Sequence, residues 1–69
     1  MLIEVDSETG VMTMLDGTKW EVNPYNLPEA VIWIPTAEIE ITKKYHGAMY
    51  DHEIRNIEND DVIRARKIS

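Results

Sequence analysis

Cysteine and phenylalanine are absent from this 69-residue chain, and glycine and proline each occur only three times. Without cysteine the chain forms neither a disulfide framework nor a cysteine-type zinc site, so packing must stabilise the fold alone. A chain of this size has room for one core, which provides about 3 to 5 kcal/mol of net stability. We therefore expect a single small domain over residues 1–69, whose marginal stability self-association would relieve.

The sequence also lacks the usual signs of catalysis. Its only serines are Ser7 and Ser69, and it has no nucleophile elbow and no glycine-rich phosphate loop. We therefore expect a noncatalytic protein that uses no cofactor. Residues 1–6 carry no basic side chain and no long apolar run, which predicts no leader peptide, no membrane span and a cytoplasmic location.

Positive charge is scarce in the first part of the chain. Residues 1–42 carry eight carboxylates and a single lysine, whereas residues 43–69 carry six basic and five acidic side chains. The formal net charge of -6 disfavours nonspecific binding to nucleic acid or to anionic membranes. The asymmetry would still allow two copies, or two neighbours, to meet with opposite potentials.

The most informative segment is an Asp-Gly turn between two runs of alternating polarity, at residues 11–15 and 18–22. Gly17 supplies positive φ without steric cost, so the segment predicts a β-hairpin. A two-residue loop would pair Leu15 with Thr18, and a three-residue loop with a bulge at Gly17 would pair Met14 with Thr18. We prefer the bulged register, because it gathers large apolar side chains on one face: Met12, Met14, Trp20 and Val22.

Other segments also predict short strands, at residues 2–5, 38–42, 50–56 and 61–68. Their alternation points an apolar set inward: Ile39, Ile41, Ile63 and Ala65. Residues 28–34 allow two interpretations, a helical turn that begins at Pro28 or a short buried strand over residues 30–34.

Five or six short strands with frequent turns are typical of a small closed sheet, because closure removes exposed edges. We predict an all-β fold, a small five- or six-stranded SH3-like or OB-like barrel. The alternative is an α+β fold with one short helix near residues 28–33.

Several short motifs occur together between residues 11 and 68: Asp16 to Val22, Trp33 followed by Pro35, Glu38 to Ile41, Asn56, and Val62 with Ala65 and Arg66. This combination resembles small bacterial all-β domains of uncharacterised function. In them a tryptophan follows an Asp-Gly turn and a second tryptophan precedes another strand. The resemblance implies a β fold and no particular activity. The chain departs from it at residues 35–37, where a turn containing glycine would be more typical.

The two tryptophans are candidates for a ligand-binding surface. Trp20 is predicted to be a core anchor, because a small protein without phenylalanine needs large apolar side chains inside. Trp33 is the better candidate for exposure, since Pro28 and Pro35 bracket it. We predict a noncatalytic interaction module that binds a protein partner or a copy of itself through an exposed strand edge or a loop surface: Tyr25, Leu27, Ile32 and Trp33.

Basic side chains near the end of the chain form a second candidate site. Arg64, Arg66 and Lys67 would present a patch on the outer face of the last strand, suited to an anion or a nucleic acid. Pairing with Glu38 or Glu40 on a neighbouring strand would explain them without a ligand.

This basic patch leads to an alternative function, an OB-like binder of single-stranded nucleic acid. The basic residues would grip the phosphates, and three aromatic side chains would stack on bases: Trp33, Tyr45 and Tyr50. The acidic net charge argues against it, and we do not favour nucleic acid as a partner.

A metalloprotein or enzyme centred on His46 and His52 is a third possibility. The two histidines are six residues apart across an expected loop, and Asp51, His52 and Glu53 alternate faces on a strand. Such side chains do not converge, so we predict no metal site.

Overall fold

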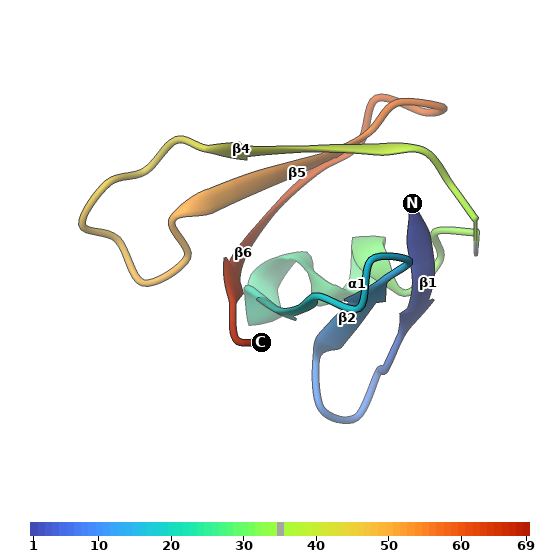
Figure 1. Ribbon diagram of the computed structural model, residues 1–69, viewed down its shortest axis with the longest axis horizontal. Helices are drawn as coiled ribbons and strands as arrows, with labels where there is room; N and C mark the ends of the chain where they lie inside the picture. Colours follow the sequence, from blue (N-terminus) through green and yellow to red (C-terminus); the bar gives the residue numbers. More distant parts are fainter. Residues whose placement is uncertain (35) are drawn as a thin grey trace.

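The computed structural model describes residues 1–34 and 36–69. Over these residues the chain forms six strands, a 3-10 turn and a short α-helix. They are β1 (Leu2–Val5), β2 (Val11–Met14), β3 (Lys19–Val22), η1 (Pro24–Asn26), α1 (Leu27–Ala30), β4 (Ile39–Lys43), β5 (His52–Asn56) and β6 (Val62–Lys67). The strands make one antiparallel sheet in the order β1-β2-β3-β6-β5-β4. The predicted mostly β, barrel-like fold is confirmed, and Figure 1 shows the sheet as a curled half-barrel.

The β2–β3 hairpin adopts the predicted bulged register. Met12 lies opposite Trp20, and the Met14 N–H donates to the Thr18 carbonyl at 2.9 Å. Gly17 has φ of 88°, a left-handed conformation that glycine adopts without strain. The four residues expected on the inner face are all buried: Met12, Met14, Trp20 and Val22.

The sheet stops short of a closed barrel. Leu2 of β1 donates its N–H to the Ala37 carbonyl at 3.2 Å, and its own carbonyl accepts from the Thr36 N–H at 2.7 Å. These bonds cover the start of β1, and a register irregularity between Leu2 and Glu4 further interrupts that edge. The other edge strand, β4, has a regular register with β5.

The helical interpretation of the segment after β3 is correct, and the strand interpretation of residues 30–34 is wrong. Pro28 stands in the first turn of α1, where its missing N–H costs no hydrogen bond. The turn continues past α1, because the Trp33 N–H donates to the Ala30 carbonyl at 3.1 Å. Pro35, which follows this segment in the sequence, lies outside the described residues.

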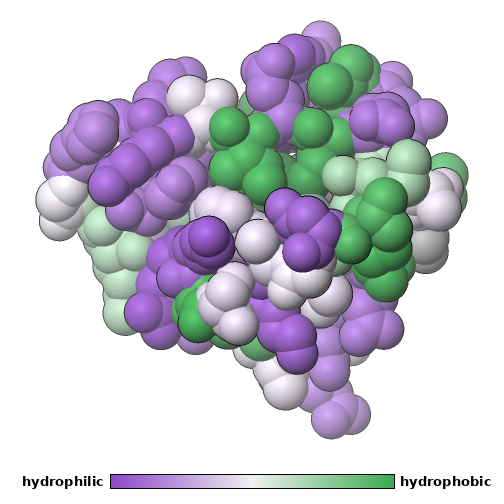
Figure 2. All heavy atoms as spheres, viewed as in Figure 1, coloured by the Kyte–Doolittle hydropathy of each residue, from purple (hydrophilic) through white to green (hydrophobic). Residues whose placement is uncertain are grey.

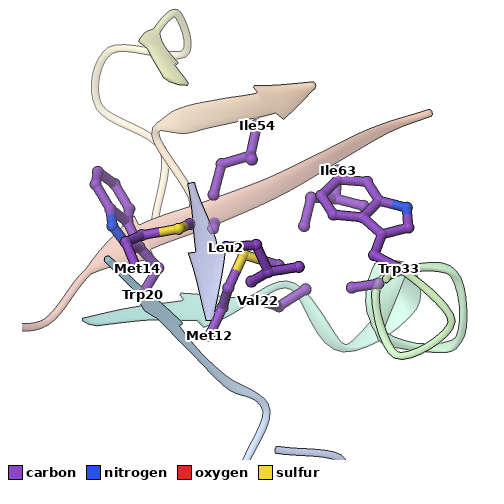
Figure 3. Packing of buried hydrophobic residues seen from close by; sticks show 10 residues of the cluster. Leu2, Met12, Met14, Trp20, Val22, Trp33, Ile54 and Ile63 are labelled. Carbon is purple, nitrogen blue, oxygen red and sulfur yellow. The ribbon is translucent and has the colours of Figure 1, made fainter. Parts of the chain in front are cut away.

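A small apolar core fills the concave side of the sheet. Figure 3 shows Trp20 and Met14 at one end of the core and Trp33, beside α1, at the other. Leu2, Met12, Val22, Ile54 and Ile63 lie between them. Trp20 is therefore a core anchor, as predicted.

Of the four side chains predicted to point inward in the second half of the chain, three are buried or half-buried. Ile63 and Ala65 are buried, and Ile39 is half-buried against the core. Ile41 is 37% exposed, because among the described residues no strand lies beyond β4 to cover it. Within the described residues, no helix has the length and apolar character needed to cross a membrane.

Candidate functional site

The predicted loop surface does not form a single patch. Trp33 is only 5% exposed, so the expectation of an exposed tryptophan is wrong. The turn after α1 carries its indole into the core, where Nε1 donates to Asp61 Oδ2 at 3.4 Å. Tyr25 is 92% exposed and is not among the residues that line the surface hollows beside Leu27 and Ile32. Leu27 and Ile32 line separate ones.

The predicted basic patch is largely engaged by β3 and by the β4–β5 loop. Arg66 lies opposite Glu21 of β3 and binds its carboxylate, which raises the pKa of the guanidinium. Arg64 stacks over the Tyr45 ring at 3.9 Å from its centroid and donates to the Tyr50 carbonyl at 3.0 Å.

The suggested pairing of these arginines with Glu38 or Glu40 is therefore wrong. In the sheet, β6 lies between β3 and β5, whereas β4 is one strand further away. Lys67 is exposed at the end of β6. Since the two guanidinium groups already have partners within the chain, the geometry gives no support to a phosphate-binding surface.

The two histidines have different surroundings in the structure. His46 is exposed in the β4–β5 loop. The His52 ring packs edge-on against the Trp20 indole, with ring centroids 4.9 Å apart. His52 Nδ1 lies 2.8 Å from Asp51 Oδ1, a hydrogen bond that lowers the pKa of the Asp51 carboxyl. In the part of the chain that the structure describes, no three side chains of metal-binding type come together.

An apolar groove opens where the half-barrel fails to close. It has a volume of about 440 Å³ and lies between β4 and the β2–β3 turn. Figure 2 shows hydrophobic residues gathered in the middle of this face, among mostly hydrophilic ones. The groove is lined by Met1, Met14, Leu15, Asp16, Ile39 and Ile41.

The backbone beside this groove has free hydrogen-bonding groups. The Glu38 carbonyl accepts from the Ile57 N–H at 3.0 Å, and the Lys44 N–H donates to the Asp51 carbonyl at 3.0 Å. Since successive residues of a strand point their N–H and C=O groups to opposite sides, the even-numbered residues of β4 face β5. The N–H and C=O groups of the odd-numbered residues face away from the sheet: Ile39, Ile41 and Lys43.

This outer edge of β4 has no backbone partner among the described residues. Its length is five residues, and over residues 1–34 and 36–69 neither a bulge nor a covering helix protects it. Proteins usually protect such an edge, because it is a template for another strand. The free edge and the adjoining groove together form the candidate site, which we call the β4 edge site.

Sequence reasoning predicted no residue of this site as a binding residue. It assigned Met14, Ile39 and Ile41 to the inner face of the sheet, and it did not single out Met1 or Leu15. Leu15 is 64% exposed because the bulged register places it in the turn, outside the strand. That register was itself predicted, so the exposure of Leu15 was implicit in the sequence. The curl that brings Met1 near β4 involves the whole sheet and leaves no local signal.

Comparisons with protein-family models, with curated proteins and with solved structures returned no match. The chemistry of the β4 edge site is therefore the basis for a functional inference.

Proposed function

We propose that this protein is a noncatalytic interaction module that binds an extended protein segment along the β4 edge. The observation that carries the proposal is a regular, unpaired strand edge directly beside an apolar groove. Main-chain hydrogen bonds to Ile39, Ile41 and Lys43 would supply affinity. Apolar side chains at alternate positions of the incoming strand would enter the groove and supply specificity.

Charge favours one direction for the incoming strand. Glu38 and Glu40 stand at the beginning of β4, and Lys43 and Lys44 stand at its end. An antiparallel strand that is acidic at its start and basic at its end would place unlike charges opposite each other. The partner is thus an extended segment with alternating apolar residues and this order of charge.

A titration monitored by ¹⁵N–¹H NMR tests the proposal. The ligand is a synthetic acetylated peptide amide, Glu-Val-Glu-Val-Thr-Lys-Lys, and the control is the same peptide with acidic and basic residues exchanged. We expect the first peptide to shift the amide signals of Ile39, Ile41 and Lys43, and the control to bind more weakly. Unperturbed β4 signals, or shifts centred on Tyr25 and Ile32 instead, would contradict the proposal.

A single substitution separates edge pairing from contacts of side chains alone. Ile41→Pro removes an N–H that faces away from the sheet and leaves the hydrogen bonds between β4 and β5 in place. Ile41→Val is the matched control, because it shortens the side chain and keeps the N–H. We expect the proline variant to lose peptide binding and the valine variant to retain it, with circular dichroism confirming that both remain folded.

A further inference from the structure

We propose that the natural occupant of the β4 edge is the same strand of a second copy of this chain. This inference rests on the proposed function and identifies its partner. The two copies would be related by a two-fold axis through Ile41, and their sheets would join into one continuous antiparallel sheet. The hydrogen bonding, charge and apolar surface of β4 each favour this pairing.

The hydrogen-bonding pattern of β4 is self-complementary. In an antiparallel pair centred on Ile41, Ile41 faces Ile41 of the second copy, and Ile39 faces Lys43 of the second copy. These are the residues whose N–H and C=O groups point away from β5. Each would form a hydrogen-bonded pair with its counterpart, while the even-numbered residues keep their bonds to β5.

The charge order of β4 is self-complementary in the same register. Glu38 would lie opposite Lys44 of the second copy, in a non-hydrogen-bonded pair where side chains approach closely. The two-fold axis repeats this pair at the other end of the interface. Both side chains are exposed in the single copy, and the Lys44 ammonium already binds Glu53 at 3.2 Å, so Glu38 of the second copy would add a second carboxylate to it.

The exposed apolar residues at the groove also favour a second copy. Ile41 would pack against its own symmetry mate, and the added strand would lie across the mouth of the groove, over Met1 and Leu15. These two side chains are 43% and 64% exposed in the single copy. Covering them would remove apolar surface from water, which is the main favourable contribution to most associations between proteins.

The outer edge of β1, the other edge strand of the sheet, cannot pair with a second copy in the same way. The start of β1 is already hydrogen-bonded to Thr36 and Ala37, and its register with β2 is irregular after Leu2. Interrupted edges of this kind resist strand addition. β4 is thus the edge of this sheet that is both regular and free over the described residues.

Charge reversal with mixing tests the register directly. Glu38→Lys places lysine opposite Lys44 of the second copy, and Lys44→Glu places glutamate opposite Glu38 of the second copy. In a dimer of either variant alone, side chains of like charge would face each other at both ends of the interface. A mixture of the two variants restores unlike pairs at both ends, which only a paired Glu38–Lys44 contact explains.

Sedimentation velocity over a concentration series provides the measurement. We expect the wild-type chain to form dimers and each variant alone to have a dissociation constant raised at least about tenfold, equivalent to about 1.4 kcal/mol. The mixture should return to within about threefold of wild type, a difference of less than 1 kcal/mol. Glu29→Lys and Lys19→Glu make the same changes of charge on exposed residues away from β4 and should leave dimerisation unchanged.

Two results would overturn the inference. One is a wild-type chain that stays monomeric up to about 1 mM, where even a weak interaction of about 4 kcal/mol would be detected. The other is a dimer that neither the reversals nor Ile41→Pro affects. In either case, binding of the synthetic peptide along β4 would preserve the proposed function, whereas its absence would remove both.

Discussion

At the scale of single residues, a chain of polar contacts explains the Asp-Gly-Thr-Lys-Trp motif. The Trp20 indole Nε1 donates to Thr18 Oγ1 at 3.1 Å, and the Thr18 hydroxyl donates to Asp16 Oδ1 at 2.6 Å. Asp16 also accepts from the Thr18 N–H at 2.9 Å, which closes the turn. The buried indole N–H thus has a partner, and the turn is tied to the core at the same time.

These contacts make the hairpin sensitive to acid. The hydroxyl and then the N–H of Thr18 lower the pKa of Asp16 below its ordinary value of 3.8. The resulting stabilisation is fully present above pH 3.8 and is lost as pH falls through the lower pKa of the folded protein. Asp16→Asn keeps an acceptor for both groups without titrating, so we expect a shallower loss of stability below pH 4 in urea unfolding followed by circular dichroism. A loss of stability below pH 4 as steep as that of the wild-type protein would contradict this role of Asp16.

Thr36 adopts a backbone conformation that is unfavourable for a β-branched residue. Its φ is 72°, in the left-handed region that glycine tolerates best, and it stands where the resemblance to other β domains led us to expect a glycine-containing turn. We expect Thr36→Gly to stabilise the protein by about 0.5 to 1 kcal/mol, after the greater entropy of glycine in the unfolded chain is included.

Thermal unfolding of two variants checks this prediction. Thr42→Gly is the control, because the same change within β4 should destabilise the protein. If both glycine variants were less stable than wild type, Thr36 would not be strained.

At the scale of elements, the segment that follows β3 continues the hydrogen bonding to β6 beyond the end of β3. The Asn23 N–H donates to the Arg64 carbonyl at 2.8 Å, and Asn26 Oδ1 accepts from the Arg64 N–H at 3.0 Å. The β3–β6 register ends one residue earlier, where Val22 lies opposite Ala65. The Asn26 side chain therefore accepts the hydrogen bond from β6 that the backbone of β3 does not reach.

Removal of this side chain should cost more than removal of a similar one nearby. Asn26→Ala leaves the partly buried Arg64 N–H without its partner, which we expect to destabilise the protein by about 1 to 3 kcal/mol. Asn23→Ala removes only an exposed bond in which the Tyr25 N–H donates to Asn23 Oδ1 at 3.0 Å, and it should cost about 0.5 to 1 kcal/mol. Urea unfolding measures both, and equal losses would contradict the role of Asn26.

Elements with a strong local sequence pattern were predictable, whereas the order in which these elements lie side by side in the sheet was not. Gly17 and the alternation around it defined the hairpin and its register, because both depend on local backbone conformation and on which face is apolar. The partners of Arg64 and Arg66 depend on strand order, and nothing local places β6 between β3 and β5. Ile41 alternates correctly in sequence, yet it is exposed because β4 is at the open side of the half-barrel.

At the scale of the whole molecule, Trp20 and Trp33 lie at opposite ends of one small core. Trp33 was expected at the surface because prolines flank it. Its burial depends on a helical turn and on Asp61, which is 28 positions away in the sequence. Contacts at such separation are not visible in local patterns, which is why the burial of Trp33 could not be predicted from the sequence.

The thermodynamic consequence is that neighbouring residues of similar polarity should respond very differently to truncation. Trp33→Ala removes a buried aromatic ring, at an expected cost of about 3 to 5 kcal/mol, comparable to the whole stability of a chain of this size. Ile32 is 73% exposed, so Ile32→Ala should change stability by less than about 0.5 kcal/mol. Circular dichroism should therefore show a largely unfolded Trp33 variant and a native Ile32 variant, and two native spectra would contradict the placement of Trp33.

The edge-on contact between Trp20 and His52 places an optical reporter at one end of the core. The indole of Trp20 lies against the imidazole of His52, with ring centroids 4.9 Å apart, whereas Trp33 lies at the other end of the core. With Trp33 replaced by phenylalanine, the remaining fluorescence would report on the surroundings of Trp20 alone. The protein thus has a built-in probe of one end of its core that needs no added dye.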